Sequence, residues 1–287
     1  MPEYPDISVY LEAIERHALG HVLQQVKLTT PFLLRTVQPP IGSFERQTLI
    51  GVRRVGKRIA LGFSNGQWMV VHLMIAGRLH WNSKRQALAS WVFDNGSMTL
   101  TEAGSKRQAS LHLFEKESDI ASVDPGGLEV FTASEPEFAA RFTAENHTLK
   151  RALTDPHILS GIGNAFSDEI LHHAQLSPVA LSQKLTPAEL ARLREAICNR
   201  LNYFTDLLRQ QTGAGFPEKV TAFRPEMAVH GKFKQPCPRC STPVQRIVYG
   251  AHETNYCPTC QTGGKLLADR ALSRLLGKDW PKTLKEA

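Results

Sequence analysis

Four cysteines near the C-terminus constrain this chain more than any other feature of its sequence. They occur as two C-x-x-C pairs, CPRC and CPTC, separated by 16 residues. Such pairs suit a tetrahedral Zn²⁺ ion, because each forms a tight knuckle and the hairpin between them brings the knuckles together. Two disulfides are the alternative, which a reducing compartment disfavours. We therefore predict one structural Zn²⁺ held by Cys237, Cys240, Cys257 and Cys260.

Basic charge is concentrated in the same part of the chain. The whole sequence has 34 lysines and arginines against 27 acidic residues, whereas residues 218–287 alone have 12 against 6. A basic region of this kind favours a polyanionic partner, because Lys and Arg that neutralise phosphates release condensed counterions. The alternative is a solvated surface with a mild excess of charge.

Length and composition narrow the class of protein. A chain of 287 residues suggests two domains with a small appended module. Hydrophobic residues make up 42% and charged residues 21%, which excludes a largely disordered protein. No apolar run approaches the roughly 20 residues that a membrane span needs. The first residues, MPEYPDISVY, lack the basic and apolar regions of a signal peptide, so we expect a cytoplasmic protein without membrane association.

The pattern of the chain changes from strands to helices along its length. After a helix over about 7–19, short alternating or β-rich runs up to residue 131 predict an antiparallel sandwich. Helical periodicity dominates after residue 135. The fold class is α+β, with domains at 1–134, 135–230 and 231–287. The predicted later helices are 135–142, 148–154, 164–174, 186–209, 219–226 and a basic helix at 265–276.

The N-terminus offers a possible nucleophile. Removal of Met1 would leave Pro2 as a free secondary amine, and α-amino groups have pKa values of about 7.7–8.0, so part of the population is neutral at pH 7. An amine can attack an aldehyde carbon to form an iminium. Glu3 beside it supplies a carboxyl group for proton transfer.

Five motifs, in order, resemble one enzyme family. They are the start M-P-E-x-P-D-I, a G-K-R segment, H-L-x-x-x-G-R-L, G-I-G-N-x-x-x-D-E-I-L and the four-cysteine finger. Together they look like the formamidopyrimidine-DNA glycosylase / endonuclease VIII family of base-excision repair enzymes. The resemblance implies an N-terminal antiparallel β-sandwich with flanking helices, then a helix–two-turn–helix domain carrying a zinc finger. It also implies a flipped base, attack by an N-terminal proline and strand cleavage by elimination.

The resemblance assigns roles to individual residues. Pro2 matches the nucleophile, and Glu3 the acid that assists opening of the sugar ring. Lys57 matches a lysine that contacts phosphate and assists elimination. Asn164 matches an asparagine that binds backbone phosphate, with Lys150 as a second candidate contact that could equally form an internal ion pair.

Several positions depart from the family pattern. Tyr4 replaces a glycine, which puts a ring beside the nucleophile. Ile75 stands where a methionine often fills the space left by the flipped base. Arg107 is our candidate for an inserted arginine. In the finger hairpin His252 replaces an arginine that contacts phosphate, with Lys232 as a further candidate contact.

The sequence therefore predicts a bifunctional DNA glycosylase and AP lyase, closer to the endonuclease VIII side of the family. Its partner would be double-stranded DNA containing oxidised bases or abasic sites, bound by a monomer that is nucleoid-associated in a bacterium. One alternative is a catalytically weak zinc-finger protein that binds damaged or abasic DNA, and a more distant one is a zinc-ribbon RNA-binding protein. The joint presence of Pro2, Glu3 and Lys57 favours the enzyme, because a pure binder needs no free N-terminal proline.

Overall fold

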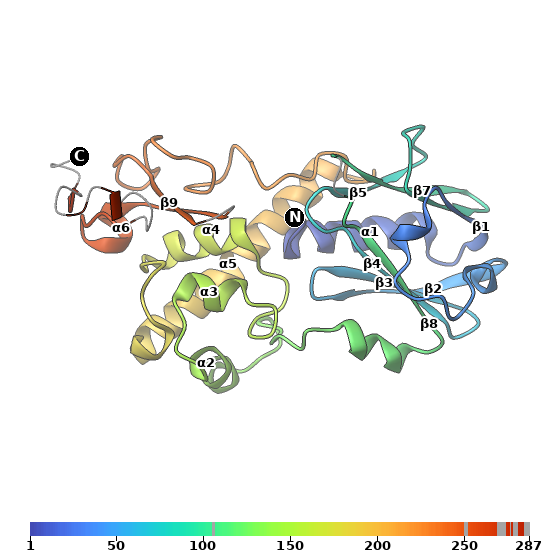
Figure 1. Cartoon of the computed structure of the whole chain (residues 1–287), viewed down its shortest axis with the longest axis horizontal. Helices are drawn as coiled ribbons and strands as arrows, with labels where there is room; N and C mark the ends of the chain where they lie inside the picture. Colours follow the sequence, from blue (N-terminus) through green and yellow to red (C-terminus); the bar gives the residue numbers. More distant parts are fainter. Residues whose placement is uncertain (105–106, 250–251, 269–273, 276, 278–280, 284–287) are drawn as a thin grey trace. The chain divides into compact units, whose positions relative to one another are not determined.

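The computed structural model describes the chain apart from residues 105–106, 250–251, 269–273, 276, 278–280 and 284–287 and the side chains of residues 249 and 252. The chain divides into two compact units (Figure 1). One comprises residues 1–126 and 203–221, and the other residues 127–202 and 222–287. The first unit thus includes a second stretch of chain, which holds the end of a long helix and the loop after it.

Eight antiparallel strands form the framework of the first unit. Their order is β5-β7-β6-β1-β2-β3-β4-β8, so neighbours in the sheet are often distant in the sequence. The strands are β1 (Val22–Leu28), β2 (Gln47–Val55), β3 (Arg58–Phe63), β4 (Trp68–His72), β5 (Gly77–Trp81), β6 (Ala89–Phe93), β7 (Gly96–Glu102) and β8 (Ser110–Phe114).

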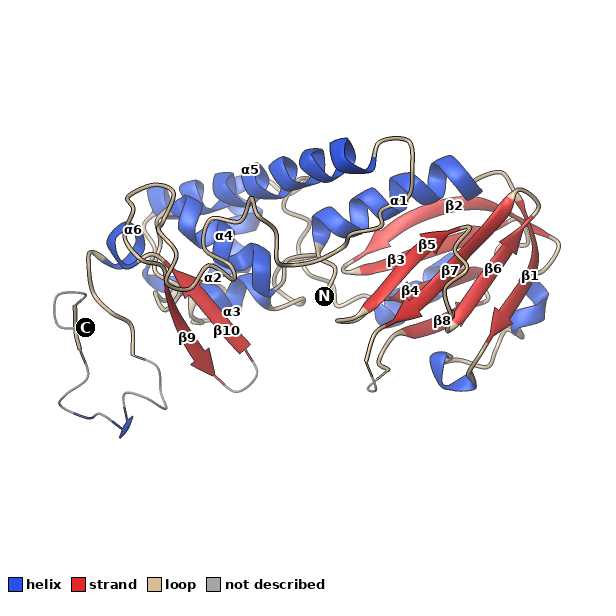
Figure 2. Cartoon of the chain, turned by 90° about the horizontal axis from the view of Figure 1, so that it is seen from above, coloured by secondary structure: helices blue, strands red, loops and turns tan. Residues whose placement is uncertain are grey.

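The sheet folds into two layers, because its halves are joined over only a short stretch (Figure 2). β1 pairs with β2 at two positions, Val22 with Thr48 and Leu23 with Gln47. Side chains from both halves then share one buried core. Within it the indole Nε1 of Trp91 on β6 lies 3.1 Å from the Met69 sulfur on β4. This arrangement confirms the predicted antiparallel sandwich.

Helix α1 (Tyr4–Ala18) covers part of this framework and contributes to its core. Ile7, Tyr10 and Ile14 point from one side of the helix into the core and are fully buried. The helix ends before Gly20, whose φ of +81° lies in the left-handed region that glycine adopts easily. Short 3-10 helices occupy Pro31–Leu33, Ile41–Phe44 and Glu117–Val123.

Helices form most of residues 127–202 in the second unit, and four of them were predicted. Ser134 and Thr148 cap α2 and α3 by accepting backbone N–H groups, which is the local reason that these helices begin there. The helices are α2 (Glu135–Thr143), α3 (Leu149–Thr154), α4 (Asn164–Ala174) and α5 (Pro187–Thr212), with a 3-10 turn at Ser182–Lys184. α5 extends into the first unit from residue 203.

The predicted helix at 219–226 is wrong. This segment is non-helical, and tertiary contacts hold it in place: Val220 is buried in the first unit's core and its carbonyl accepts from Arg78 Nε at 2.7 Å. A basic helix was predicted at 265–276. Its first residue, Lys265, instead forms an isolated β-bridge with Thr283, and residues 266–268 are not helical. Residues 269–273 and 276 of that prediction lie outside the described residues.

The cysteine-containing part of the second unit is a small hairpin and a short helix. Strands β9 (Gln245–Tyr249) and β10 (His252–Tyr256) pair antiparallel, and α6 (Pro258–Thr262) follows. Among the described residues, no helix has the length and apolarity that crossing a bilayer requires.

Candidate functional site

The four predicted cysteines meet at one point in the second unit. Their sulfur atoms all lie within 4.8 Å of one another, and none is in a disulfide. The measured separations are 3.9 Å for Cys237–Cys260, 3.4 Å for Cys240–Cys257 and 3.5 Å for Cys240–Cys260. A tetrahedron with Zn–S bonds of about 2.3 Å has edges of about 3.8 Å, so this cradle fits a Zn²⁺ ion. These cysteines bind the protein's one structural zinc.

Two side chains that the sequence did not single out support the cradle. His172 Nε2 on α4 lies 3.2 Å from Cys237 Sγ, and burial lowers the pKa of His172 to about 4, so the ring is neutral. Gln261 accepts from Cys257 N at 2.8 Å and donates to Leu176 O at 3.0 Å. Such outer contacts orient metal ligands.

The first unit places the predicted nucleophile at the start of α1. Pro2 and Glu3 are both buried, Glu3 to 3% exposure. Glu3 is the N-cap of α1, and Asp6 at the third helical position accepts the Glu3 N–H at 3.0 Å, which completes a capping box. The helix therefore fixes the backbone of both candidate catalytic residues.

Charges from three elements act on the chain's amino terminus. Burial is the main reason that the pKa of the Met1 amine is lowered; Arg78 and Lys57 lower it further, whereas Glu3 and Asp6 oppose the shift. Burial also lowers the pKa of Lys57, which Glu3 opposes. The fold thus places the amino terminus, Glu3 and Lys57 within electrostatic reach of one another.

Lys57 is presented by the β2–β3 turn, and Tyr4 helps to hold that turn. Gly56 adopts a φ of +60°, which turns the chain directly before Lys57. Arg54 donates to the Gly56 carbonyl at 2.8 Å, and its guanidinium lies 4.5 Å from the centre of the Tyr4 ring. The ring that departs from the family pattern is therefore linked through Arg54 to the turn that carries Lys57.

His72, at the end of β4, belongs to this group and was missed by sequence analysis. It pairs with Arg58 across the sheet. Burial, then Arg58, Lys57 and His112, lower its pKa to about 4, so its ring is neutral. Its Nδ1 accepts from Met74 N at 3.2 Å. The only sequence signal was its place at the head of the H-L-x-x-x-G-R-L motif.

Ile75 occupies the tip of the turn after β4 and is 60% exposed. Gly77 N donates to Leu73 O at 2.9 Å, and a side chain at Gly77 would meet that oxygen at 2.2 Å. Arg78 donates to the carbonyls of Ile75 and Gly77 at 3.1 and 2.7 Å. The turn is therefore tightly held while its apolar tip stays accessible.

Arg107 lies in the segment before β8 and is exposed. The carboxylate of Glu102 accepts from the backbone N–H groups of Gln108 and Ala109, which anchors the chain directly after it. Arg107 is thus an exposed cation directly before an anchored segment, and its insertion into DNA stays a prediction.

The second unit holds Asn164 at the first position of α4. Its backbone carbonyl accepts from Lys150 Nζ at 2.7 Å, and its Nδ2 donates to the Glu253 carbonyl at 3.1 Å. Lys150 also forms an ion pair of 2.5 Å with Asp168, whose side chain is fully buried. Lys150 therefore takes part in the internal ion pair that the sequence left open, and it fixes the start of the helix that carries Asn164.

Two adjacent carboxylates on α4, those of Asp168 and Glu169, bind residues 228–230 and 255. Asp168 Oδ2 lies 2.8 Å from His230 Nδ1 and accepts from Asn255 N at 3.1 Å. Glu169 accepts from the backbone N–H groups of residues 228, 229 and 230 at 2.8–2.9 Å. These contacts join residues about 60 to 90 positions apart, and neither Asp168 nor His230 was predicted to take part.

The remaining predicted contacts lie near the zinc hairpin. Lys232 is half-buried, with its backbone N–H bonded to Val229 O at 3.0 Å. His252 opens β10 opposite Tyr249, and its side chain lies outside the described part of the structure. Arg246 pairs with Glu253 at 3.0 Å and stacks on Phe233 at 4.3 Å.

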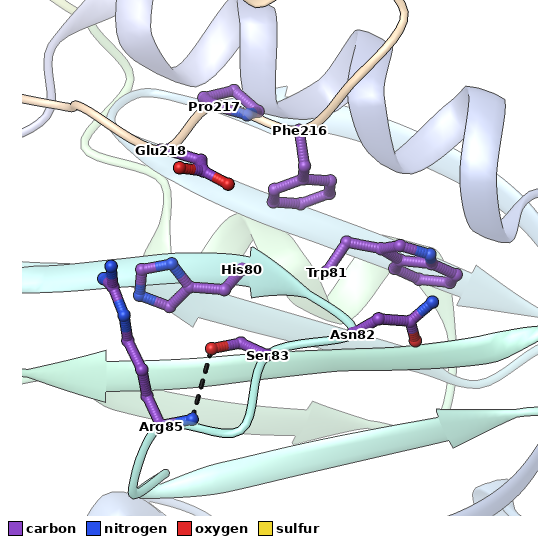
Figure 3. Close-up of a pocket in the computed structure, with 8 residues that line it drawn as sticks. All are labelled: His80, Trp81, Asn82, Ser83, Arg85, Phe216, Pro217 and Glu218. Carbon is purple, nitrogen blue, oxygen red and sulfur yellow. Dashed lines mark hydrogen bonds between the residues drawn. The ribbon is translucent and has the colours of Figure 1, made fainter.

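A pocket elsewhere in the first unit contains none of the predicted site residues (Figure 3). Its volume is about 160 Å³, and Trp81 stacks with Phe216 at its apolar end with ring centres 6.4 Å apart. His80 is held by Thr101 at 2.9 Å. The lining residues are His80, Trp81, Asn82, Ser83, Arg85, Phe216, Pro217 and Glu218.

Comparison with protein families accounts for most of the chain. The formamidopyrimidine-DNA glycosylase N-terminal domain matches residues 1–125, and the formamidopyrimidine-DNA glycosylase H2TH (helix–two-turn–helix) domain matches residues 125–207. A zinc finger found in FPG and IleRS matches residues 234–263. These matches confirm the predicted fold class.

Individual relatives agree. An uncharacterized formamidopyrimidine-DNA glycosylase-like protein of Mycobacterium tuberculosis is 39% identical over 155 residues, covering 54% of this chain and 94% of that protein. The formamidopyrimidine-DNA glycosylase of Desulforamulus reducens is 28% identical over 91% of this chain and 99% of its own. MutM (Fpg) from Thermus thermophilus has a TM-score of 0.78 at 25% identity, covering 91% of this chain and 98% of that one. Lactococcus lactis Fpg, in complex with DNA containing an abasic site, shares the fold with a TM-score of 0.79 at 19% identity over 91% of this chain and 99% of its own. The motifs, the domain matches and these relatives together place the chain in the formamidopyrimidine-DNA glycosylase family.

Proposed function

We propose that the protein is a bifunctional DNA glycosylase and AP lyase that acts on double-stranded DNA containing oxidised bases or abasic sites. The observation that carries this proposal is that the chain's amino terminus, Glu3 and Lys57 lie within electrostatic reach of one another near the start of α1. Relatives named as formamidopyrimidine-DNA glycosylases, and a relative crystallised on abasic-site DNA, support the choice of substrate.

The chemistry requires Pro2 as a free amine, hence removal of Met1. The Pro2 nitrogen attacks C1′ of the damaged nucleotide, and the bond from C1′ to the base breaks, so that the base leaves with the bonding electrons and takes up a proton. The nitrogen then loses its proton, Glu3 protonates the sugar-ring oxygen, and the ring opens to an iminium. Removal of a C2′ proton expels the 3′ phosphate by β-elimination, and a second elimination expels the 5′ phosphate.

Lys57 assists from the β2–β3 turn. Because burial lowers its pKa, a larger neutral fraction can exchange a proton during elimination than for a solvated lysine. In its protonated form the same ammonium group contacts a phosphate. Tyr4 and Arg54 keep the turn, and therefore this amine, in place.

The remaining contacts hold the duplex around the flipped nucleotide. The exposed tip of Ile75 fills the space that the base leaves, with Arg107 inserted beside it. Asn164 binds a backbone phosphate, and Lys150 fixes the start of its helix. Lys232 and His252 reach phosphates from the zinc-binding part of the chain.

Borohydride trapping tests the proposal. The iminium is reducible, so borohydride added during reaction with an abasic-site duplex should link protein to DNA covalently, and the link should map to Pro2. A matched control that retains extra residues ahead of Pro2 should not trap, because an amide nitrogen has no nucleophilic lone pair.

One experimental outcome would favour a DNA-binding protein without catalytic activity over the enzyme. If mass spectrometry shows a free Pro2 and the protein binds abasic DNA but never traps, the glycosylase proposal fails. The protein would then act by binding damaged or abasic DNA without cutting it.

A further inference from the structure

A basic cluster that none of the roles above uses lies on the outer face of the β2–β3–β4–β8 layer. Arg58 on β3 pairs with His72 on β4, and His112 on β8 pairs with Val70, two residues before His72. Register partners and alternate residues of a strand share a face. Arg58, His72 and His112 therefore point to the same side of three neighbouring strands.

The rest of this face is apolar and covered. Val55, Ala60, Val70, Phe114 and Ile120 form a separate buried cluster there, and Ile120 comes from the 3-10 helix at Glu117–Val123. Glu117 of the same helix is taken up by an ion pair of 3.1 Å with Arg53. The covering segment thus protects the apolar end, and its one acid that acts on Arg58, the C-cap residue Asp124, forms no ion pair with it.

Arg58 and His112 have no counter-charge in contact. Within the described residues, neither side chain forms a hydrogen bond or an ion pair, and Arg58 Nε and His112 Nδ1 are buried without a partner. The one acid that acts on Arg58, Asp124, does so at a distance and is outweighed by burial, which lowers the pKa of Arg58. Burial, Arg58 and Arg35 lower the pKa of His112.

Buried N–H groups without an acceptor, such as those of Arg58 and His112, cost free energy, and a bound anion can lower that cost. A half-buried guanidinium without acceptors loses hydrogen bonds that water would have supplied. A phosphodiester oxygen can bind the other N–H groups of the same guanidinium and the second ring nitrogen of His112, and it supplies the counter-charge that the buried guanidinium lacks. Lys57, next to Arg58 in the sequence, adds positive charge at the same end of the layer.

We propose that Arg58 and His112 form an additional phosphate-binding site, which takes a backbone phosphate of the DNA strand beyond the one that Lys57 contacts. This site rests on the proposed function, since its ligand is the DNA on which that function acts. It extends the path of the strand from the β2–β3 turn across the ends of β3, β4 and β8.

The test is the salt dependence of binding by the full-length, zinc-loaded protein to a duplex carrying a tetrahydrofuran abasic site. Arg58→Gln should weaken binding about three- to tenfold at low salt and reduce the slope of log affinity against log salt by about 0.9, the loss of one phosphate contact. His112→Gln should weaken binding less, and adding it to Arg58→Gln should not remove a second full contact, because both side chains serve one phosphate.

Two variants make the result specific. Arg58→Lys keeps the charge and should keep the slope, whereas Lys27→Gln removes an exposed lysine from β1 of the other layer and should change neither affinity nor slope. A wild-type slope in Arg58→Gln, or an equal loss in Arg58→Lys, would overturn the site.

Failure of this site and failure of the proposed function are separable. A wild-type protein that traps on abasic DNA, with a slope that does not depend on Arg58, disproves only the additional site. A wild-type protein that never traps, with a slope that still depends on Arg58, disproves the glycosylase proposal and leaves the phosphate site.

Discussion

Two lysines predicted to touch DNA have opposite surroundings in the two units. In the second unit Lys150 is 14% exposed and forms an ion pair of 2.5 Å with the buried Asp168. In the first unit Lys57 is half-buried and, among the described residues, makes no ion pair. Burial therefore disfavours its charged form and lowers its pKa. A paired lysine holds structure, whereas a desolvated, unpaired lysine is ready to exchange a proton or meet an anion.

The contrast extends beyond the lysines. In the second unit Asp168 and Glu169 accept from His230, Asn255 and three consecutive backbone amides, so their charges are used inside the protein. In the first unit Lys57 and Arg58 are consecutive in the sequence, and the nearby acids do not offset the effect of burial on their charges. We infer that the charges on α4 serve folding, whereas Lys57 and Arg58 of the first unit stay without a counter-charge in contact.

The largest expected effect comes from removing the zinc. Cys237→Ser should release the metal and unfold the cysteine-containing part of the second unit, since metal binding to such small modules contributes on the order of 10 kcal/mol. DNA affinity should fall at least about a hundredfold, because the proposed phosphate contacts of residues 232 and 252 and the support of α4 would be lost together. Zinc analysis with circular dichroism measures the first effect and equilibrium binding the second.

The matched control is Cys198→Ser, which removes a thiol outside the cluster. It should retain zinc and affinity. Purified native protein that contains no zinc would contradict the prediction, as would a Cys237→Ser variant that binds the metal as tightly as the native protein.

The lysine comparison predicts opposite changes in stability. Lys150→Met leaves a buried carboxylate without its cation and should lower the free energy of unfolding by about 3–5 kcal/mol. Lys57→Met removes a desolvated, unpaired charge and should not destabilise the protein, while elimination at abasic sites slows by about 10²-fold or more. Urea unfolding and a strand-cleavage assay measure the two effects.

The pH dependence sharpens the same prediction. Because the folded-state pKa of Lys57 lies below its unfolded value of 10.5, the folded state binds fewer protons between those two values. Lys57 therefore makes stability fall as the pH is lowered through that window, and Lys57→Met should lose this part of the slope. Equal destabilisation by the two lysine variants would disprove the contrast.

The sequence predicted features whose signals are local. The cysteine spacing indicated the zinc site, and capping residues such as Ser134 and Thr148 mark helix starts close to those predicted. Features that depend on distant pairing were missed. His230 meets Asp168 across 62 positions, and His72 joins Arg58 and His112 only through the strand register.

Errors arose where tertiary contacts override local preference. The segment at 219–226 has helical spacing, but Val220 is drawn into the first unit's core and bonded to Arg78. The first helix was predicted to begin near residue 7, yet its N-cap is Glu3 and Asp6 closes the capping box from inside the helix. Because Glu3 follows Pro2 directly in the sequence, the earlier start brings both candidate catalytic residues to the beginning of the helix.

The smallest expected effect concerns Tyr4, whose ring packs on Arg54 and so helps to hold the turn that carries the unpaired Lys57. Tyr4→Leu removes the ring beneath Arg54, an interaction worth about 1 kcal/mol, and so loosens the contact between Arg54 and Gly56. The lyase rate should fall roughly fivefold, because about 1 kcal/mol in the placement of Lys57 corresponds to that factor.

Tyr4→Phe keeps the ring and should retain the native rate, whereas Arg54→Met should match Tyr4→Leu. Single-turnover cleavage of an abasic duplex at saturating protein measures the rate apart from binding. Equal rates for the Phe and Leu variants would mean that the ring does not hold the turn, and that Gly56 and the strand pairing of β2 and β3 position Lys57 without it.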